Sequence, residues 1–158
     1  ENLVLVARLR HLPDAGRIAD ALLARFQLTE AADRRVSTYS GGMRRRLDIA
    51  MSLIGDPPVI FLDEPTTGLD PVTSAVIDQL MVRVREELGT TAIVVTHDIR
   101  SAYTVGDRIA MLYEGRIRQV GTVQEIQQTE DPVVRQFIEG RPDIQDARGA
   151  TAFARGGA

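Results

Sequence analysis

The sequence contains no lysine and no cysteine. All 19 basic residues among its 158 are arginine, so no site within these residues can use a lysine side chain. The absence of cysteine excludes disulfides and thiolate metal sites, and it favours a reducing compartment. No apolar run approaches the roughly 18 residues that a membrane-spanning helix needs, and the start carries no basic-then-apolar signal segment.

Strong net charge is also missing. A net charge of −3 provides no general attraction for nucleic acid, so we expect no nucleic-acid partner. The apolar fraction of 44% is ordinary for a globular protein with a sizeable core. The chain begins Glu1-Asn2-Leu3 without an initiator methionine, and we expect it to be a piece of something longer.

Helical periodicity dominates the first third of the chain. The apolar spacing predicts helices over residues 1–11 and 15–27, with Pro13 ending the first. Ser40 is a natural N-cap for a third helix that reaches about Ile54. We therefore expect a helical subdomain over residues 1–56.

The next segment reads as a strand, a helix and a strand. Val59–Leu62 is a continuous apolar run, which is typical of a strand buried on both faces of a parallel sheet. A helix is predicted over residues 72–88, with Gly89 as its stop, and a second buried strand over residues 90–96. This order predicts a βαβ unit, and therefore an α/β fold with helices flanking a parallel sheet.

The remainder is predicted as short elements. A helix over residues 99–105 precedes two strands around a hairpin turn at Glu114-Gly115. Helices near 122–128 and 131–139 complete an α/β portion over residues 57–140. The last segment, residues 141–158, has little apolar content and is expected to be disordered.

Two groups of ionisable residues follow the predicted strands directly. Asp63-Glu64 ends the first strand and His97 ends the second, so both should lie at the edge where parallel sheets bind ligands. One carboxylate could hold Mg²⁺ while the other orients an attacking water, and the imidazole could contact a terminal phosphate. The alternatives are a solvated acidic pair in a loop and a structural histidine.

A glycine-bearing turn opens the third helix. In Ser40-Gly41-Gly42 the glycines allow close approach, and the free amides of a helix start favour an anion. Arg44, Arg45 and Arg46 follow, at the end of the helix where its dipole disfavours cations. They form either a solvated basic face or a surface for an anionic ligand or acidic partner.

Four segments in order strongly resemble the nucleotide-binding subunits of ABC transporters. Tyr39–Met43 is similar to the family signature loop, with Tyr and Met in place of the commoner Leu and Gln. Val59–Asp63 resembles the Walker B strand, Gly68–Asp70 the D-loop, and Thr96–Asp98 the segment of the switch histidine. The resemblance covers essentially residues 1–140.

The resemblance implies a role for each of these residues. It implies Mg²⁺ coordination by Asp63, a catalytic carboxylate in Glu64 and a switch histidine in His97. It implies a fold of the P-loop NTPase type and a head-to-tail dimer that encloses ATP. In that dimer, the residues of this chain expected to face the nucleotide from the partner's side are Ser40, Gly41, Gly42 and Asp70.

The same resemblance implies a transmembrane permease partner and a cytoplasmic position on the inner face of the membrane. It also exposes a gap, because the family's P-loop, G-x-x-x-x-G-K-[ST], needs a lysine that this chain lacks. We expect that the chain starts just after the family's Gln-bearing loop. The parent protein should hydrolyse ATP, whereas this chain alone should not.

Two further expectations concern alternatives and assembly. A non-catalytic assembly fragment that pairs with a complete ATPase is a second hypothesis, and a DNA-repair-type ATPase is a third, disfavoured by the missing coiled coils.

The start of the chain resembles daunorubicin-resistance exporters, whereas Asp131–Gly140 is more similar to ATPases of lipid-transport permeases. Without preceding strands, the 59–62 strand should keep an exposed edge or face, which favours association.

Overall fold

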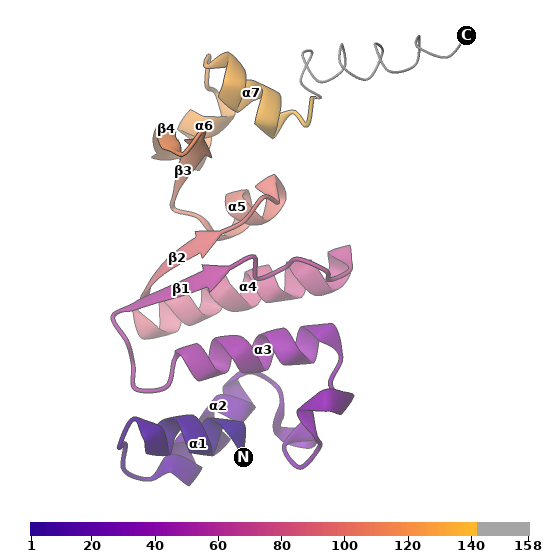
Figure 1. Ribbon diagram of the computed structural model, residues 1–158, viewed down its shortest axis with the longest axis vertical. Coiled ribbons are helices and arrows are strands. Elements are labelled where there is room, and N and C mark those ends of the chain that lie inside the picture. Colours follow the sequence, from indigo (N-terminus) through magenta and orange to yellow (C-terminus); the bar gives the residue numbers. More distant parts are fainter. Residues whose placement is uncertain (142–158) are drawn as a thin grey trace, which may run out of the picture. The chain divides into compact units, whose positions relative to one another are not determined.

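The computed structural model describes residues 1–141, which form two compact units that divide between Val105 and Gly106. Figure 1 shows their elements in chain order. The sequence-based division at residue 56 does not coincide with this boundary, and it stays a prediction about functional segments. Of the predicted disordered tail, residues 142–158 lie outside the described residues. No helix within residues 1–141 combines the length and the apolar character needed to cross a membrane.

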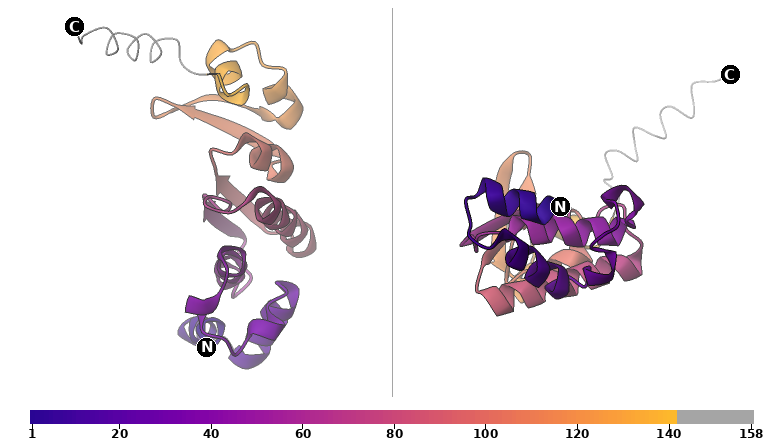
Figure 2. Two further views of the ribbon diagram at one scale, coloured as in Figure 1. Left: turned by 90° about the vertical axis from the view of Figure 1, so that its right-hand side faces the viewer. Right: turned by 90° about the horizontal axis from the view of Figure 1, so that it is seen from below.

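Three helices build the first part of the first unit. They are α1 (Asn2–Leu9), α2 (Ala15–Arg25) and α3 (Gly41–Ser52), and the 3-10 turns η1 (Thr29–Ala31) and η2 (Val36–Thr38) join the last two. Figures 1 and 2 show α3 between the α1–α2 pair and the long helix α4 (Pro71–Leu88). The predicted helices are confirmed because their apolar faces meet in one core that includes Leu3, Ala7, Leu22, Phe26, Leu47 and Ala50. The third helix is shorter than predicted and ends at Ser52.

A βαβ unit forms the second part, as predicted. β1 (Val59–Asp63) pairs in parallel with β2 (Thr91–Val95), from Val59 opposite Thr91 to Asp63 opposite Val95. α4 (Pro71–Leu88) connects the strands, and it ends at Gly89 in the left-handed conformation with φ of 63°. The short helix α5 (Ile99–Val105) follows β2.

The prediction that Val59–Leu62 is buried on both faces is wrong, and so is the prediction that the second strand is buried. The expectation that the 59–62 strand keeps an exposed face is confirmed. Ile60 and Leu62 are buried in the core that α3 and α4 share with β1. The opposite face is open, because Phe61 is 73% exposed, Ile93 47% and Val95 56%. The apolar run identifies a strand that is built for two covered faces, but the described residues supply helices for only one.

The second unit is a hairpin followed by two short helices. β3 (Arg108–Tyr113) and β4 (Arg116–Thr122) are antiparallel, with an irregularity between Met111 and Leu112. The predicted turn is confirmed, since Glu114 and Gly115 both have positive φ, 49° and 73°. α6 (Val123–Gln127) starts with a capping box between Thr122 and Glu125, and α7 (Pro132–Ile138) follows.

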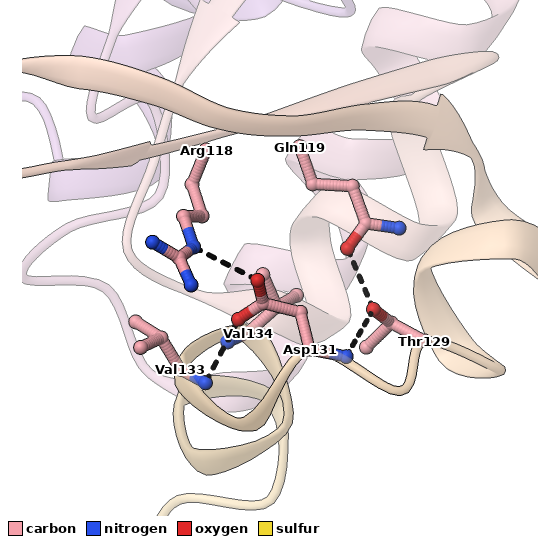
Figure 3. A network of polar contacts seen from close by, with 6 residues as sticks. All are labelled: Arg118, Gln119, Thr129, Asp131, Val133 and Val134. Atoms are coloured by element: carbon pink, nitrogen blue, oxygen red, sulfur yellow. Dashed lines mark hydrogen bonds and ion pairs between the residues drawn. The ribbon is translucent and has the colours of Figure 1, made fainter.

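Asp131 joins α7 to the hairpin of the second unit (Figure 3). Its Oδ1 accepts from two amides in the first turn of α7, at 2.9 and 3.3 Å, and its Oδ2 accepts from Arg118 Nε at 2.8 Å. Thr129 accepts from the Asp131 amide and donates to Gln119 Oε1. Partial burial acts to raise the pKa of Asp131, but the hydrogen bond from Arg118 and those from α7 outweigh it and lower the pKa.

Candidate functional site

Glu64 and His97 meet at the carboxyl ends of the two parallel strands. The Glu64 amide donates to Val95 O at 2.8 Å, which extends the strand pairing by one residue. The Glu64 carboxylate then accepts from His97 Nδ1 at 2.8 Å through Oε1, and from Thr67 Oγ1 at 2.8 Å through Oε2. The prediction that the acidic pair and the histidine share one edge of the sheet is confirmed.

The two side chains stabilise each other's charged forms. The hydrogen bond from His97, followed by that from Thr67, lowers the pKa of Glu64, and burial acts in the opposite direction. The hydrogen bond to Glu64 raises the pKa of His97. Because an ionised carboxylate only accepts, Nδ1 carries the proton and Nε2 is left to face solvent or a ligand. His97 is 72% exposed at its side chain, so Nε2 is open to a ligand from solution.

Asp63 has different surroundings from Glu64. It lies on the exposed side of β1, beside Phe61, and it lines a pocket of about 170 Å³. The pocket is formed where α3 passes β1, and its lining also includes Arg45, Asp48, Ser52 and Pro65. The two adjacent carboxylates therefore have different surroundings, and the separate roles expected for them stay a prediction.

The residues around Asp63 fit a partial magnesium site. No group of three or more His, Cys, Asp or Glu side chains within residues 1–141 could hold a metal alone. Mg²⁺ commonly takes one or two protein carboxylates and completes its shell with water and substrate phosphates. Asp63 can provide such a ligand, so metal binding here would depend on a phosphate-bearing substrate.

The glycine turn has a packing role in this structure. Ser40 caps α3 by accepting from the Met43 amide at 3.3 Å, as predicted for an N-cap. A Cβ on Gly42 would lie 2.6 Å from Thr73 Cγ2, and a Cβ on Gly41 would lie 3.0 Å from Leu69 Cδ2. The glycines thus let the start of α3 approach the start of α4, and their approach to phosphate stays a prediction.

Asp70 is occupied as the N-cap of α4. Its Oδ1 accepts from the amides of Val72 and Thr73, at 3.1 and 3.0 Å, and its Oδ2 accepts from the Thr73 hydroxyl. The hydroxyl bond, followed by the amide bond from the same residue, lowers the pKa of Asp70. A contact of this carboxylate with nucleotide stays a prediction, and it would compete with the cap.

Two of the three arginines at the start of α3 hydrogen-bond to backbone carbonyls. Arg44 Nε donates to Tyr39 O at 3.2 Å, and Arg45 Nη2 donates to Glu64 O at 3.0 Å. Arg44 is exposed and Arg45 is half-buried, and a contact of either with an anionic ligand or an acidic partner stays a prediction. Sequence reasoning singled out the arginines but missed the partners, because carbonyl acceptors leave no signal in the sequence. Thr67 was missed as well, although it follows Glu64 by one turn.

Comparisons with known proteins show which family the chain resembles. Residues 2–67 match the family model described as ABC transporter, which includes the glycine turn and the acidic pair. The daunorubicin resistance ATP-binding protein DrrA3 of Streptomyces coeruleorubidus is 46% identical over 128 residues, which are 80% of this chain and 40% of that protein. Over four fifths of its length, this chain is similar to ATP-binding members of the ABC transporter family.

Other members of the ABC transporter family are similar over the same extent. ABC transporter A family member 2 of Arabidopsis thaliana is 42% identical over 124 residues, covering 77% of this chain and 12% of that protein. The phospholipid-transporting ATPase ABCA7 of Homo sapiens is 41% identical over 129 residues, covering 80% and 6%. The chain spans less than half of the length of each of these relatives. ABC transporter domains of this kind bind ATP, generally with Mg²⁺, and generally dimerise and pair with transmembrane permease domains.

Proposed function

We propose that these residues form the signature, Walker B and switch-histidine portion of an ATP-hydrolysing subunit that drives an ABC transporter. The contact between Glu64 and His97, at 2.8 Å, is the observation that carries the proposal. It joins a carboxylate that can orient water to an imidazole that can address a phosphate. Both side chains are at the edge of a parallel sheet, where ligands of such sheets bind.

Each residue then has a definite task in hydrolysis. Glu64 orients the attacking water and accepts its proton, and its lowered pKa keeps it ionised for that purpose. His97 holds Glu64 through Nδ1 and presents Nε2 to the terminal phosphate. Asp63 would hold Mg²⁺, which neutralises charge on the phosphate oxygens when it is bound. Ser40, Gly41 and Gly42 stabilise the terminal phosphate of the partner subunit's nucleotide with their amides and hydroxyl.

The proposal includes the partners and the location of the assembly. A second ATPase subunit completes each nucleotide site, and a transmembrane permease receives the movement that closure produces. The complex works at the inner face of the cell membrane. Relatives carry names for daunorubicin or doxorubicin resistance and for phospholipid transport, so we propose a drug-like or lipid-like transported substrate.

A chimera tests the hydrolytic role. A segment that carries the family's P-loop, G-x-x-x-x-G-K-[ST], is fused in front of residue 1, which provides the lysine that these 158 residues lack. We expect Mg²⁺-dependent release of phosphate from ATP, and a decrease of about 10²-fold or more with Glu64→Gln. Glu30→Gln, at an exposed position of the same unit, is the matched control and should hydrolyse ATP normally.

The unfused chain completes the test. On its own it should show no turnover, because the phosphate cradle needs the missing lysine. Turnover by the purified chain that disappears with Glu64→Gln would contradict the proposed dependence on a P-loop. If the chimera binds ATP but does not hydrolyse it, the assembly-fragment hypothesis is favoured instead. Hydrolysis at an unchanged rate with Glu64→Gln would contradict the catalytic role of Glu64.

A further inference from the structure

We propose that Arg45 is a positioning residue, which ties the helix after the glycine turn to the backbone of Glu64 and thereby holds the Glu64 carboxylate against His97. The carrying observation is the hydrogen bond from Arg45 Nη2 to Glu64 O at 3.0 Å, between residues 19 positions apart. The catalytic meaning of this bond rests on the proposed function of Glu64. The positioning itself is a property of the chain without nucleotide.

Arg45 lies at a position in α3 that is unfavourable for a cation unless a specific contact stabilises it. It lies in the second turn of a helix whose first residue is Gly41, where the helix dipole disfavours a cation. Its side chain is half-buried and lines the pocket at the end of β1. An arginine that only faced solvent would be exposed and would not donate to a backbone carbonyl. Because its guanidinium is charged, Arg45 makes a stronger hydrogen bond to Glu64 O than a neutral donor would.

The Glu64 backbone needs support from its neighbours. Its φ is 46°, in the left-handed region that residues other than glycine adopt uncommonly. Such a conformation persists only when surrounding contacts determine it. The amide is held by Val95 O on β2, and the carbonyl accepts from the Thr67 amide at 3.2 Å and from Arg45. Arg45 is therefore the contact through which α3 acts on this residue.

Arg44 provides an internal comparison. It precedes Arg45 on the same helix, but it donates to Tyr39 O, within the turn that leads into α3. The bond of Arg44 thus stays within the turn before α3, whereas the bond of Arg45 reaches the residue that follows β1. Arg44 therefore shares the helix and the charge of Arg45 but not its contact with Glu64.

Histidine spectra provide a direct test, because the chain has only two histidines, His11 and His97. The imidazole ¹⁵N resonances are recorded at one neutral pH for the 158-residue chain and its variants. Arg45→Ala should shift the His97 signals toward those of a free imidazole, by an amount comparable to the shift with Glu64→Ala. The His11 signals should not move. Arg44→Ala, the matched control, should leave both histidines unchanged.

The outcomes separate positioning from general stability. Arg45→Lys keeps a cationic donor and should hold His97 closer to its original shift than Arg45→Ala does. If the amide spectrum shows that Arg45→Ala is unfolded, Arg45→Gln is used instead, and the same shift of the His97 signals is expected. Unchanged His97 signals in the folded variant, or an equal shift with Arg44→Ala, would overturn the proposal. The test uses no ATP, so the NMR result can be interpreted even if the proposed ATP hydrolysis is contradicted.

Discussion

Gly42 has no side chain at the point where the start of α3 meets the start of α4. An added methyl group would lie 2.6 Å from Thr73 Cγ2, and Thr73 cannot turn away easily because its hydroxyl is bonded to Asp70. We expect Gly42→Ala to lower the free energy of unfolding by about 1–3 kcal/mol, the usual effect of overpacking. Urea unfolding of the purified chain measures it.

Two other glycines serve as controls for that experiment. Gly41→Ala meets only the flexible end of Leu69 at 3.0 Å, so its effect should be clearly smaller. Gly16→Ala in α2 meets nothing within 4 Å and should stabilise by about 0.4–1 kcal/mol. Equal effects at Gly41 and Gly42 would contradict the packing explanation.

The Glu64–His97 contact should depend on pH in both directions. The pKa of Glu64 is lowered from 4.5, so its stabilising contribution is present above 4.5 and is lost as the pH falls through its lower folded value. The pKa of His97 is raised from 6.5, so its contribution is present below 6.5 and is lost as the pH rises through its higher folded value. The contact should be strongest between these two ordinary values.

An NMR titration of the two histidines measures this dependence. His97 should titrate above 6.5, and Glu64→Gln should move its pKa back toward that value. A His97 pKa that does not respond to Glu64→Gln would show that the pair is not in contact in solution.

At the scale of elements, a buried polar pair joins α4 to α5. Ser101, 1% exposed, donates its hydroxyl to Oδ1 of Asp78, which is 7% exposed. Burial raises the pKa of Asp78, with a smaller contribution of the same sign from Asp98, while the bond from Ser101 opposes both. Since α5 starts two residues after His97, this pair also anchors the segment that carries the histidine.

Removing the Ser101 hydroxyl should leave the Asp78 carboxylate buried without its donor. We expect Ser101→Ala to lower the free energy of unfolding by about 1–3 kcal/mol, measured by urea unfolding. The loss should be larger at higher pH, because a raised folded pKa means that stability falls as the pH rises through it. Ser74→Ala, which removes only a long 3.4 Å bond on the same α4, should have little effect. A pH-independent loss would contradict the role of Asp78.

At the scale of the whole molecule, the exposed apolar face of the β1–β2 pair favours association between copies of the chain. Phe61, Ile93 and Val95 expose apolar surface, and within residues 1–141 no third strand pairs with β1 or β2. Exposed apolar faces and unpaired strand edges promote association. We expect the chain to associate as its concentration rises, which sedimentation velocity can follow. Phe61→Ser should weaken this association more than Leu112→Ser, a control at an equally exposed position of the second unit. A monomer at every concentration would contradict the prediction.

Most elements of the fold follow from local patterns in the sequence. The helix at 99–105, the turn at Glu114-Gly115 and the stop at Gly89 agree with the structure because periodicity and turn chemistry act over a few residues. The burial of the strands does not follow in this way. Val59–Leu62 has the composition of a strand that is buried on both faces, but its burial depends on which distant segments pack against each face.

In the candidate site, too, local features follow from the sequence, whereas contacts between distant segments do not. The sequence alone determined the residue types, their order and the edge of the sheet where Asp63, Glu64 and His97 lie, since a strand end is a local feature and parallel strands share their carboxyl edge. Only the tertiary structure decided that Glu64 is held by His97 and Thr67, and that Arg45 holds its carbonyl. These contacts join segments far apart in the chain, and a carbonyl acceptor is the same in every residue, so packing alone selects the partner.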